Sequence, residues 1–153
     1  HKNCPMEDIK LKDKKNENRN EELDEYFKQL DIKFATLEKF GSSLLVIGYF
    51  LFIHGANIDI LDSLDMNNTG ETASSVTLLG AELILVGYAL LFIVASDRLE
   101  EKKLQNDLLS QNTNLTPHEN LYYAYFFSII INMLRVHALS EIDKANKSGE
   151  TFV

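Results

Sequence analysis

The chain has 153 residues, enough for one domain, and its 15 basic and 23 acidic residues give a formal net charge of −8. This balance excludes nucleic acid as a partner, because contacts with phosphates need clusters of Lys and Arg. The single cysteine, Cys4, excludes an internal disulfide and a zinc site built from cysteines.

The first 39 residues are polar and fall into two parts. Residues 1–20 are highly charged and are expected to be disordered. From residue 21 onward, apolar residues recur at alternating steps of four and three positions. They are Leu23, Phe27, Leu30, Phe34 and Leu37. This spacing predicts a cytoplasmic amphipathic or coiled-coil helix over residues 21–39, which offers a surface to a protein partner.

Three apolar segments follow and predict a membrane domain over residues 40–139. The clearest, residues 73–96, contains Glu82 as its only ionisable residue and is long enough to cross the ~30 Å hydrocarbon core of a bilayer. The first, residues 40–60, is interrupted by polar residues only near its end. The third, residues 119–139, is apolar only as far as Ile131, so it either spans the bilayer or lies at its interface.

These segments predict an all-α integral membrane protein. A long N-terminal helix is continuous with the first span, a helical hairpin follows, and the chain ends with a third span or an interfacial helix. Thr116-Pro117-His118-Glu119 matches a capping box and predicts that the third helix begins with Thr116 as its N-cap. Residues 98–109 are expected to continue the second helix, and residues 140–153 to form a polar tail.

The distribution of basic residues predicts the orientation, because Lys and Arg beside spans favour the cytoplasmic side. Residues 57–72, between the first two apolar segments, contain four acidic residues and no basic one. Lys and Arg instead precede the first segment and follow the second, which predicts a cytoplasmic N-terminus. Small size, few spans and charged ends are common among small bacterial membrane proteins. By this analogy we expect a bacterial cytoplasmic (inner) membrane.

Glycines continue the heptad spacing into the apolar region. They are Gly41, Gly48 and Gly55 in the first segment and Gly80 and Gly87 in the second. In lipid, small residues allow helix backbones to approach closely. In an antiparallel hairpin we expect Gly48 opposite Gly87 and Gly55 opposite Gly80. The glycines pack either within the hairpin or between subunits, and we expect a homo-oligomer assembled through the first helix.

Four polar residues form a predicted intramembrane cluster. At ~1.5 Å per residue, His54, Glu82 and Arg135 lie roughly 20, 21 and 23 Å from the cytoplasmic ends of their segments, with Asn132 one turn below Arg135. An isolated charge in lipid is costly, so Arg135 is expected to meet Glu82. The cluster is interpreted as a fold-specifying pair, as an arginine reaching the headgroups, as a proton or ion pathway, or as a partner site.

No sequence motif indicates catalysis. The chain lacks a phosphate-binding glycine loop, a zinc-protease or serine-hydrolase motif and an EF-hand loop, and its four histidines lie far apart. We therefore expect no enzyme activity, no cofactor and no metal. The sequence favours a non-enzymatic membrane assembly component, a pore former or scaffold, that self-associates in the lipid bilayer. The alternative is a small ion- or proton-coupled channel or transporter that uses Glu82 with His54, Asn132 and Arg135.

Overall fold

The computed structural model describes residues 5–109 and 112–149, with side chains from residue 18 onward. It contains three helices in these ranges: α1 (Pro5–Ser63), α2 (Ala73–Leu109) and α3 (Thr116–Ser148). No strand occurs in the described ranges, which confirms the all-α prediction. The predicted continuity of the N-terminal helix with the first apolar segment is also confirmed, since α1 has no break between them.

Two helices are longer than predicted. α1 begins at Pro5, so residues 5–20 are helical rather than disordered, because Glu, Lys and Leu are good helix formers even in a highly charged segment. Residues 1–4 lie outside the described residues. α3 continues through residues 140–148, which we expected in a polar tail, and ends at Gly149 with φ 72°. There the Gly149 N–H donates to the Ala145 carbonyl, a common way to end a helix.

The start of α3 corrects the predicted capping box. The helix begins at Thr116 itself, and Leu115 is its N-cap without a side-chain capping bond. The Asn114 Oδ1 atom instead accepts a hydrogen bond from the Thr116 N–H at 3.1 Å. Asn114 therefore provides a side-chain acceptor for a backbone N–H at the start of α3. The short amide side chain of asparagine competes well for such donors. The predicted continuation of α2 to residue 109 is confirmed.

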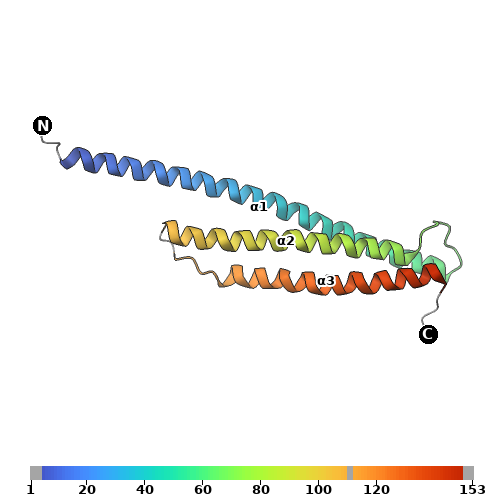
Figure 1. The fold of residues 1–153 in the computed structure, drawn as a ribbon. Helices are drawn as coiled ribbons and strands as arrows, with labels where there is room; N and C mark the ends of the chain where they lie inside the picture. The colour runs from blue at the N-terminus through green and yellow to red at the C-terminus, as the bar shows by residue number, and fades with distance from the viewer. Residues whose placement is uncertain (1–4, 110–111, 150–153) are drawn as a thin grey trace. The chain divides into compact units, whose positions relative to one another are not determined.

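The chain divides into two units, residues 1–35 and 36–153. In the first unit the predicted heptad positions carry the least exposed side chains, and Phe27 and Phe34 are 5% and 4% exposed. The second unit contains the rest of α1 together with α2 and α3. Within it, α2 and α3 lie side by side and antiparallel, and the connection over residues 64–72 lies at the end where α3 finishes (Figure 1).

The interior of the second unit combines alanines with larger apolar side chains such as Leu91 and Leu99, whereas many other large apolar side chains face outward. Ile58 and Ile84 are the largest side chains that are fully buried. The exposed large apolar residues within the predicted spans are Phe40, Val46, Ile47, Tyr49, Phe50, Ile53 and Ile60 on α1, Leu79, Val86 and Ile93 on α2, and Leu121, Tyr123, Phe126, Phe127, Ile130, Ile131, Met133 and Leu134 on α3. Among the described helices, α1 and α2 are long and apolar enough to cross a membrane.

Candidate functional site

The contact between α1 and α2 is built on glycines. Gly41 lies against Gly87, and Gly48 lies against Gly80. A Cβ atom placed on Gly48 would stand 2.6 Å from the Gly80 carbonyl oxygen, and one placed on Gly80 would stand 2.7 Å from the Gly48 carbonyl oxygen. The two backbones therefore meet directly, and the glycines of α1 are used within the hairpin of one chain.

The register of this hairpin differs from the predicted one by seven residues. Gly48 pairs with Gly80 rather than with Gly87, and Gly55 faces Ala73 and Thr77. The cause is the connection over residues 64–72, which does not form a symmetric turn. Because α2 begins beside Gly55, the last two turns of α1 extend past the start of α2, and the connection returns along them.

Asn67 organises this returning connection. Its Nδ2 donates to the Asp62 carboxylate at 2.7 Å and to the Glu71 carbonyl at 3.2 Å. Its Oδ1 accepts from the Thr69 N–H at 3.0 Å and from the Thr69 hydroxyl at 2.7 Å. One side chain thus joins the end of α1 to the approach to α2.

His54 belongs to the connection and not to the predicted intramembrane cluster. Its Nε2 lies 3.2 Å from the Glu71 Oε2, and both side chains are about half exposed. The predicted depth of His54 assumes that all of residues 40–60 are embedded in the membrane. In the structure, the returning connection brings Glu71 to the level of His54. This contact separates His54 from Glu82, Asn132 and Arg135.

Arg135 lies in a cluster to which all three helices contribute. Its Nη1 donates to the Oδ1 of the buried Asn132 at 3.1 Å, and its guanidinium lies 5.7 Å from the centre of the Phe52 ring on α1. On α2, the Tyr88 hydroxyl lies near enough to Arg135 for an electrostatic interaction between the two side chains. Asn132 in turn donates to the Ser128 carbonyl at 2.8 Å. Arginine suits such a site, because its planar, weakly hydrated head stacks on aromatic faces.

The expected Glu82–Arg135 contact is not formed. Two contacts define the register of α2 against α3, the Ser75–Asp143 hydrogen bond and the packing of Tyr88 on Tyr125. In this register, Glu82 lies at about the level of Arg135 along the helix pair. However, Glu82 lies on an exposed face of α2, and its side chain makes no hydrogen bond or ion pair with any residue that the structure describes. Its neighbours on this face are Leu79, Val86 and Ile93, all exposed.

Asp143 anchors the end of α3 to the start of α2, a role that we did not predict. Its Oδ1 accepts from the Ser75 and Ser74 hydroxyls at 2.7 and 3.0 Å, and its Oδ2 accepts from the Lys147 ammonium at 2.6 Å. The Lys147 ammonium, together with the Ser75 hydroxyl, holds the pKa of the Asp143 carboxyl below its ordinary value. The sequence signals for this anchor are two consecutive serines, Ser74 and Ser75, near the start of α2, and an acidic residue, Asp143, four positions before Lys147 on α3.

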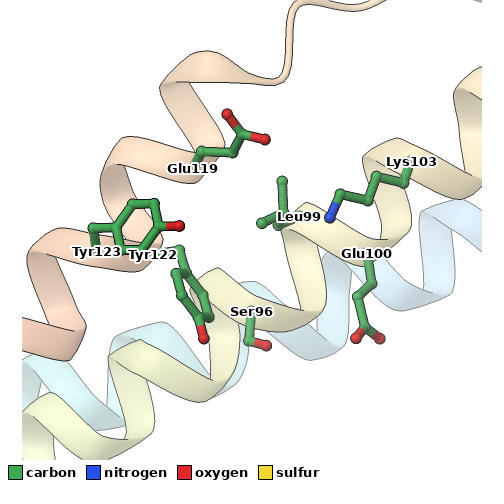
Figure 2. A pocket seen from close by; sticks show the side chains of 7 residues that line it. All are labelled: Ser96, Leu99, Glu100, Lys103, Glu119, Tyr122 and Tyr123. Atoms are coloured by element: carbon green, nitrogen blue, oxygen red, sulfur yellow. The ribbon is translucent and has the colours of Figure 1, made fainter.

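A pocket of 290 Å³ opens between α2 and α3 at the opposite end of the pair. Its lining residues are Ser96, Leu99, Glu100 and Lys103 from α2 and Glu119, Tyr122 and Tyr123 from α3. Figure 2 shows Glu119 and Lys103 on opposite sides of Leu99, whereas Glu100 points away from α3. The Tyr122 ring is held by Phe92, at 5.0 Å between ring centres.

Within the described part of the chain, no group of three His, Cys, Asp or Glu side chains is placed to hold a metal ion. Comparison with known proteins finds no matching family model, no matching curated protein and no matching solved structure.

Proposed function

We propose that this chain is a small membrane protein that self-associates and serves as a non-enzymatic assembly component of the bilayer. The distribution of side chains supports membrane insertion. Glycines form the contact between α1 and α2, and large apolar side chains are exposed on the outer surfaces of all three helices. This arrangement suits a lipid solvent, in which close backbone contact replaces the hydrophobic drive for association.

We propose three spans. α3 runs antiparallel along α2, from the Phe92–Tyr122 contact at one end to the Ser75–Asp143 bond at the other. If α2 crosses the bilayer, the apolar part of α3 then lies at the same depth. The acidic connection between α1 and α2 lies outside and the N-terminus in the cytoplasm, as the Lys and Arg positions favour. A bacterial cytoplasmic membrane stays a prediction, as does a protein partner for residues 21–39.

Glu82 is the observation that supports self-association. It lies about 14 Å and about 21 Å from the two ends of the apolar segment 73–96, within the hydrocarbon region of the proposed span. Ionisable residues at this depth nearly always face a protein interior or a water-filled cavity, because exposure to lipid is costly. Glu82 faces outward in one copy of the chain. A second copy that covers Leu79, Glu82, Val86 and Ile93 would remove this cost.

The α3 helix of a neighbouring copy offers the complementary chemistry. His137 is exposed on α3, about one turn from the level of Glu82. A contact between Glu82 of one copy and His137 of the next joins two different faces, so it repeats from copy to copy and closes a ring when the rotation allows. A channel through Glu82, His54, Asn132 and Arg135 lacks comparable support. Asn132 and Arg135 are hydrogen-bonded to each other, but His54 contacts Glu71 and Glu82 faces outward.

The test is the molecular mass of the full chain in mild detergent, measured by light scattering over a range of concentrations. We expect an oligomer that Glu82→Leu weakens strongly and Glu82→Gln weakens less, because Gln keeps hydrogen-bonding capacity. Ser42→Leu, a similar change on an exposed face of α1, is the matched control and should leave the mass unchanged. A wild-type monomer at every concentration, or a Glu82→Leu variant that assembles normally, would contradict the proposal.

A double-mutant cycle tests the partner residue. If Glu82 meets His137 across the interface, the effects of Glu82→Gln and His137→Gln on the association constant are not additive. Additive effects would place the contact elsewhere on the neighbouring copy. That result would leave self-association through the Glu82 face intact but would overturn the repeating α2–α3 arrangement.

A further inference from the structure

The pocket between α2 and α3 lies where the apolar stretches of both helices end. Ser96 closes the apolar segment of α2, and Leu121 opens the apolar part of α3, so the pocket lining lies at this boundary. In the membrane arrangement proposed above, this is the level of the lipid headgroups on the cytoplasmic side. Tyr122 and Tyr123 in the lining are residues that membrane proteins favour at this depth.

The charged groups of the lining are available to a ligand. The side chains of Glu100, Lys103 and Glu119 form no ion pair or hydrogen bond with one another or with any other described residue. The lining carries the ammonium of Lys103 and two carboxylates, of which that of Glu100 points away from α3 (Figure 2). Such a site favours a ligand that presents a cation and, a short distance away, an anion.

We propose that this pocket binds the headgroup of a phosphatidylethanolamine-type lipid, an inference that rests on the membrane location proposed above. The ligand's ammonium donates hydrogen bonds to the Glu119 carboxylate, and its phosphate accepts from the Lys103 ammonium. Both are charge-assisted contacts, the strong class of hydrogen bond. Glu119 and Lys103 lie on either side of Leu99, which separates the two charged ends of the ligand (Figure 2).

The volume and surroundings of the pocket fit a headgroup rather than a whole lipid. At 290 Å³ it lies just below the volumes of typical ligand pockets, which range over roughly 300–1,000 Å³. The acyl chains would stay outside it, along the exposed apolar residues that continue toward the membrane centre. Phe126 on α3 lies on this path, within about one turn of Tyr122 and Tyr123 in the lining.

Other common headgroups match the lining less well. An anionic headgroup such as phosphatidylglycerol offers no cation to the two carboxylates, which would repel its phosphate. A choline headgroup carries a cation without N–H donors, so it cannot hydrogen-bond to Glu119, and its recognition usually needs an aromatic cage. The lining instead offers two tyrosines and two carboxylates.

The experiment measures binding of dioctanoyl phosphatidylethanolamine, phosphatidylcholine and phosphatidylglycerol to the full chain in mild detergent. Native mass spectrometry counts the retained lipids, and the thermal unfolding midpoint gives the half-saturating concentration. We expect ethanolamine lipid to bind about tenfold more tightly than the other two, and Glu119→Gln to remove that preference. Lys103→Gln should weaken binding of all three lipids about tenfold, because each of them carries the phosphate. Asp107→Asn, the same loss of a carboxylate charge farther along α2, is the matched control and should change nothing.

Insertion into phosphatidylcholine vesicles, measured in parallel, separates this proposal from the membrane proposal. A chain that inserts but binds the three lipids equally, whose preference survives Glu119→Gln, or whose lipid binding is unchanged by Lys103→Gln, overturns the headgroup site and leaves the membrane location standing. A chain that does not insert overturns both. Stronger binding of phosphatidylcholine would assign the pocket to a tyrosine-based choline site and would also overturn the proposal.

Discussion

The two contact faces of α2 differ in what holds them together. Toward α1 the contact consists of glycines. Because these residues have no side chain, the carbonyl oxygens of one helix lie close to the positions where Cβ atoms would stand on the other. Toward α3 it consists of large or polar side chains, such as Tyr88 against Tyr125 and Ser75 against Asp143. The α1–α2 contact therefore requires that side chains are missing at the glycines, whereas the α2–α3 contact requires the side chains that form it.

This difference predicts opposite sensitivities to mutation. An added atom on the α1 side must push two backbones apart, which weakens dispersion contacts along the whole interface. A removed atom on the α3 side leaves a donor or acceptor without a partner, and such a group is costly in a nonpolar environment. In the proposed membrane location, neither loss is compensated by a hydrophobic drive that re-forms the contact.

The largest expected effect comes from Gly48→Leu. A Cβ atom at this position already stands 2.6 Å from the Gly80 carbonyl oxygen, and leucine adds three more carbon atoms. Even the single methyl group of Gly48→Ala forces a backbone shift, which typically costs about 1–3 kcal/mol. We expect Gly48→Leu to abolish the folded hairpin, measured as loss of the thermal unfolding transition in mild detergent.

Gly41→Ala provides the graded control for this prediction. Its Cβ atom would lie 3.1 Å from the Gly87 carbonyl oxygen, so the neighbour needs to move by only a few tenths of an ångström. The unfolding midpoint should therefore fall less for Gly41→Ala than for Gly48→Ala. The reverse order would mean that Gly48 and Gly80 do not form the closest contact of the hairpin.

Asp143→Asn should produce the second-largest effect. The substitution keeps the shape of the side chain but removes the charge that accepts from Lys147 and from two serine hydroxyls. Hydrogen bonds to a charged group each contribute about 1.5–3 kcal/mol, so we expect a clear fall in the unfolding midpoint at neutral pH. Glu141→Gln, which affects only an exposed pair with Lys144, is the matched control and should have little effect.

The pH dependence gives this prediction a separate readout. The folded state lowers the pKa of Asp143 below its ordinary value of about 3.9. Its contribution to stability is therefore complete above that ordinary value and is lost as the pH falls through the lower, folded-state pKa. The wild type should lose more stability than Asp143→Asn when the pH is reduced below 4. Parallel pH profiles for the two proteins would show that Asp143 does not anchor α3.

Arg135→Leu tests the polar cluster around Arg135, which joins α3 to Phe52 on α1. The change leaves the Oδ1 of the buried Asn132 without its donor, which costs about 1–3 kcal/mol, and removes the guanidinium from the Phe52 ring. Arg135→Lys keeps the charge but not the planar head, so it should recover only part of the loss. Full recovery by lysine, judged by the unfolding midpoint, would mean that charge alone matters at this position.

The same two contacts show how far the sequence could predict the structure. Glycines at every seventh position correctly indicated close contact between α1 and α2, but this spacing is satisfied equally by registers that differ by seven residues. The choice between Gly80 and Gly87 as the neighbour of Gly48 depends on how the connection over residues 64–72 folds, and its path follows from the Asn67 hydrogen bonds.

Residue counting likewise predicted the level of Glu82 and Arg135 but not their faces. Depth depends only on the rise per residue, which is constant in a helix. The face depends on which sides of α2 the other two helices occupy, and that is settled by contacts such as Phe92 with Tyr122 and Phe126. The apolar pattern of α2 is too uniform to indicate these sides, since nearly every residue of 73–96 is apolar or small.

Asn67→Ala should give the smallest change in the unfolding midpoint. It tests the comparison between the two contact faces of α2 directly, because it loosens the connection over residues 64–72 and changes no residue of either face. It removes four hydrogen bonds, all of them in an exposed part of the connection, where water replaces the lost partners and keeps their net contribution to stability small. Hydrogen exchange over residues 64–72 should increase strongly while the unfolding midpoint falls little. Asn68→Ala, at an exposed neighbouring position, is the control and should change neither. If Asn67→Ala instead lowers the midpoint as far as Gly48→Ala does, the connection, and not the glycine contact, holds α1 against α2.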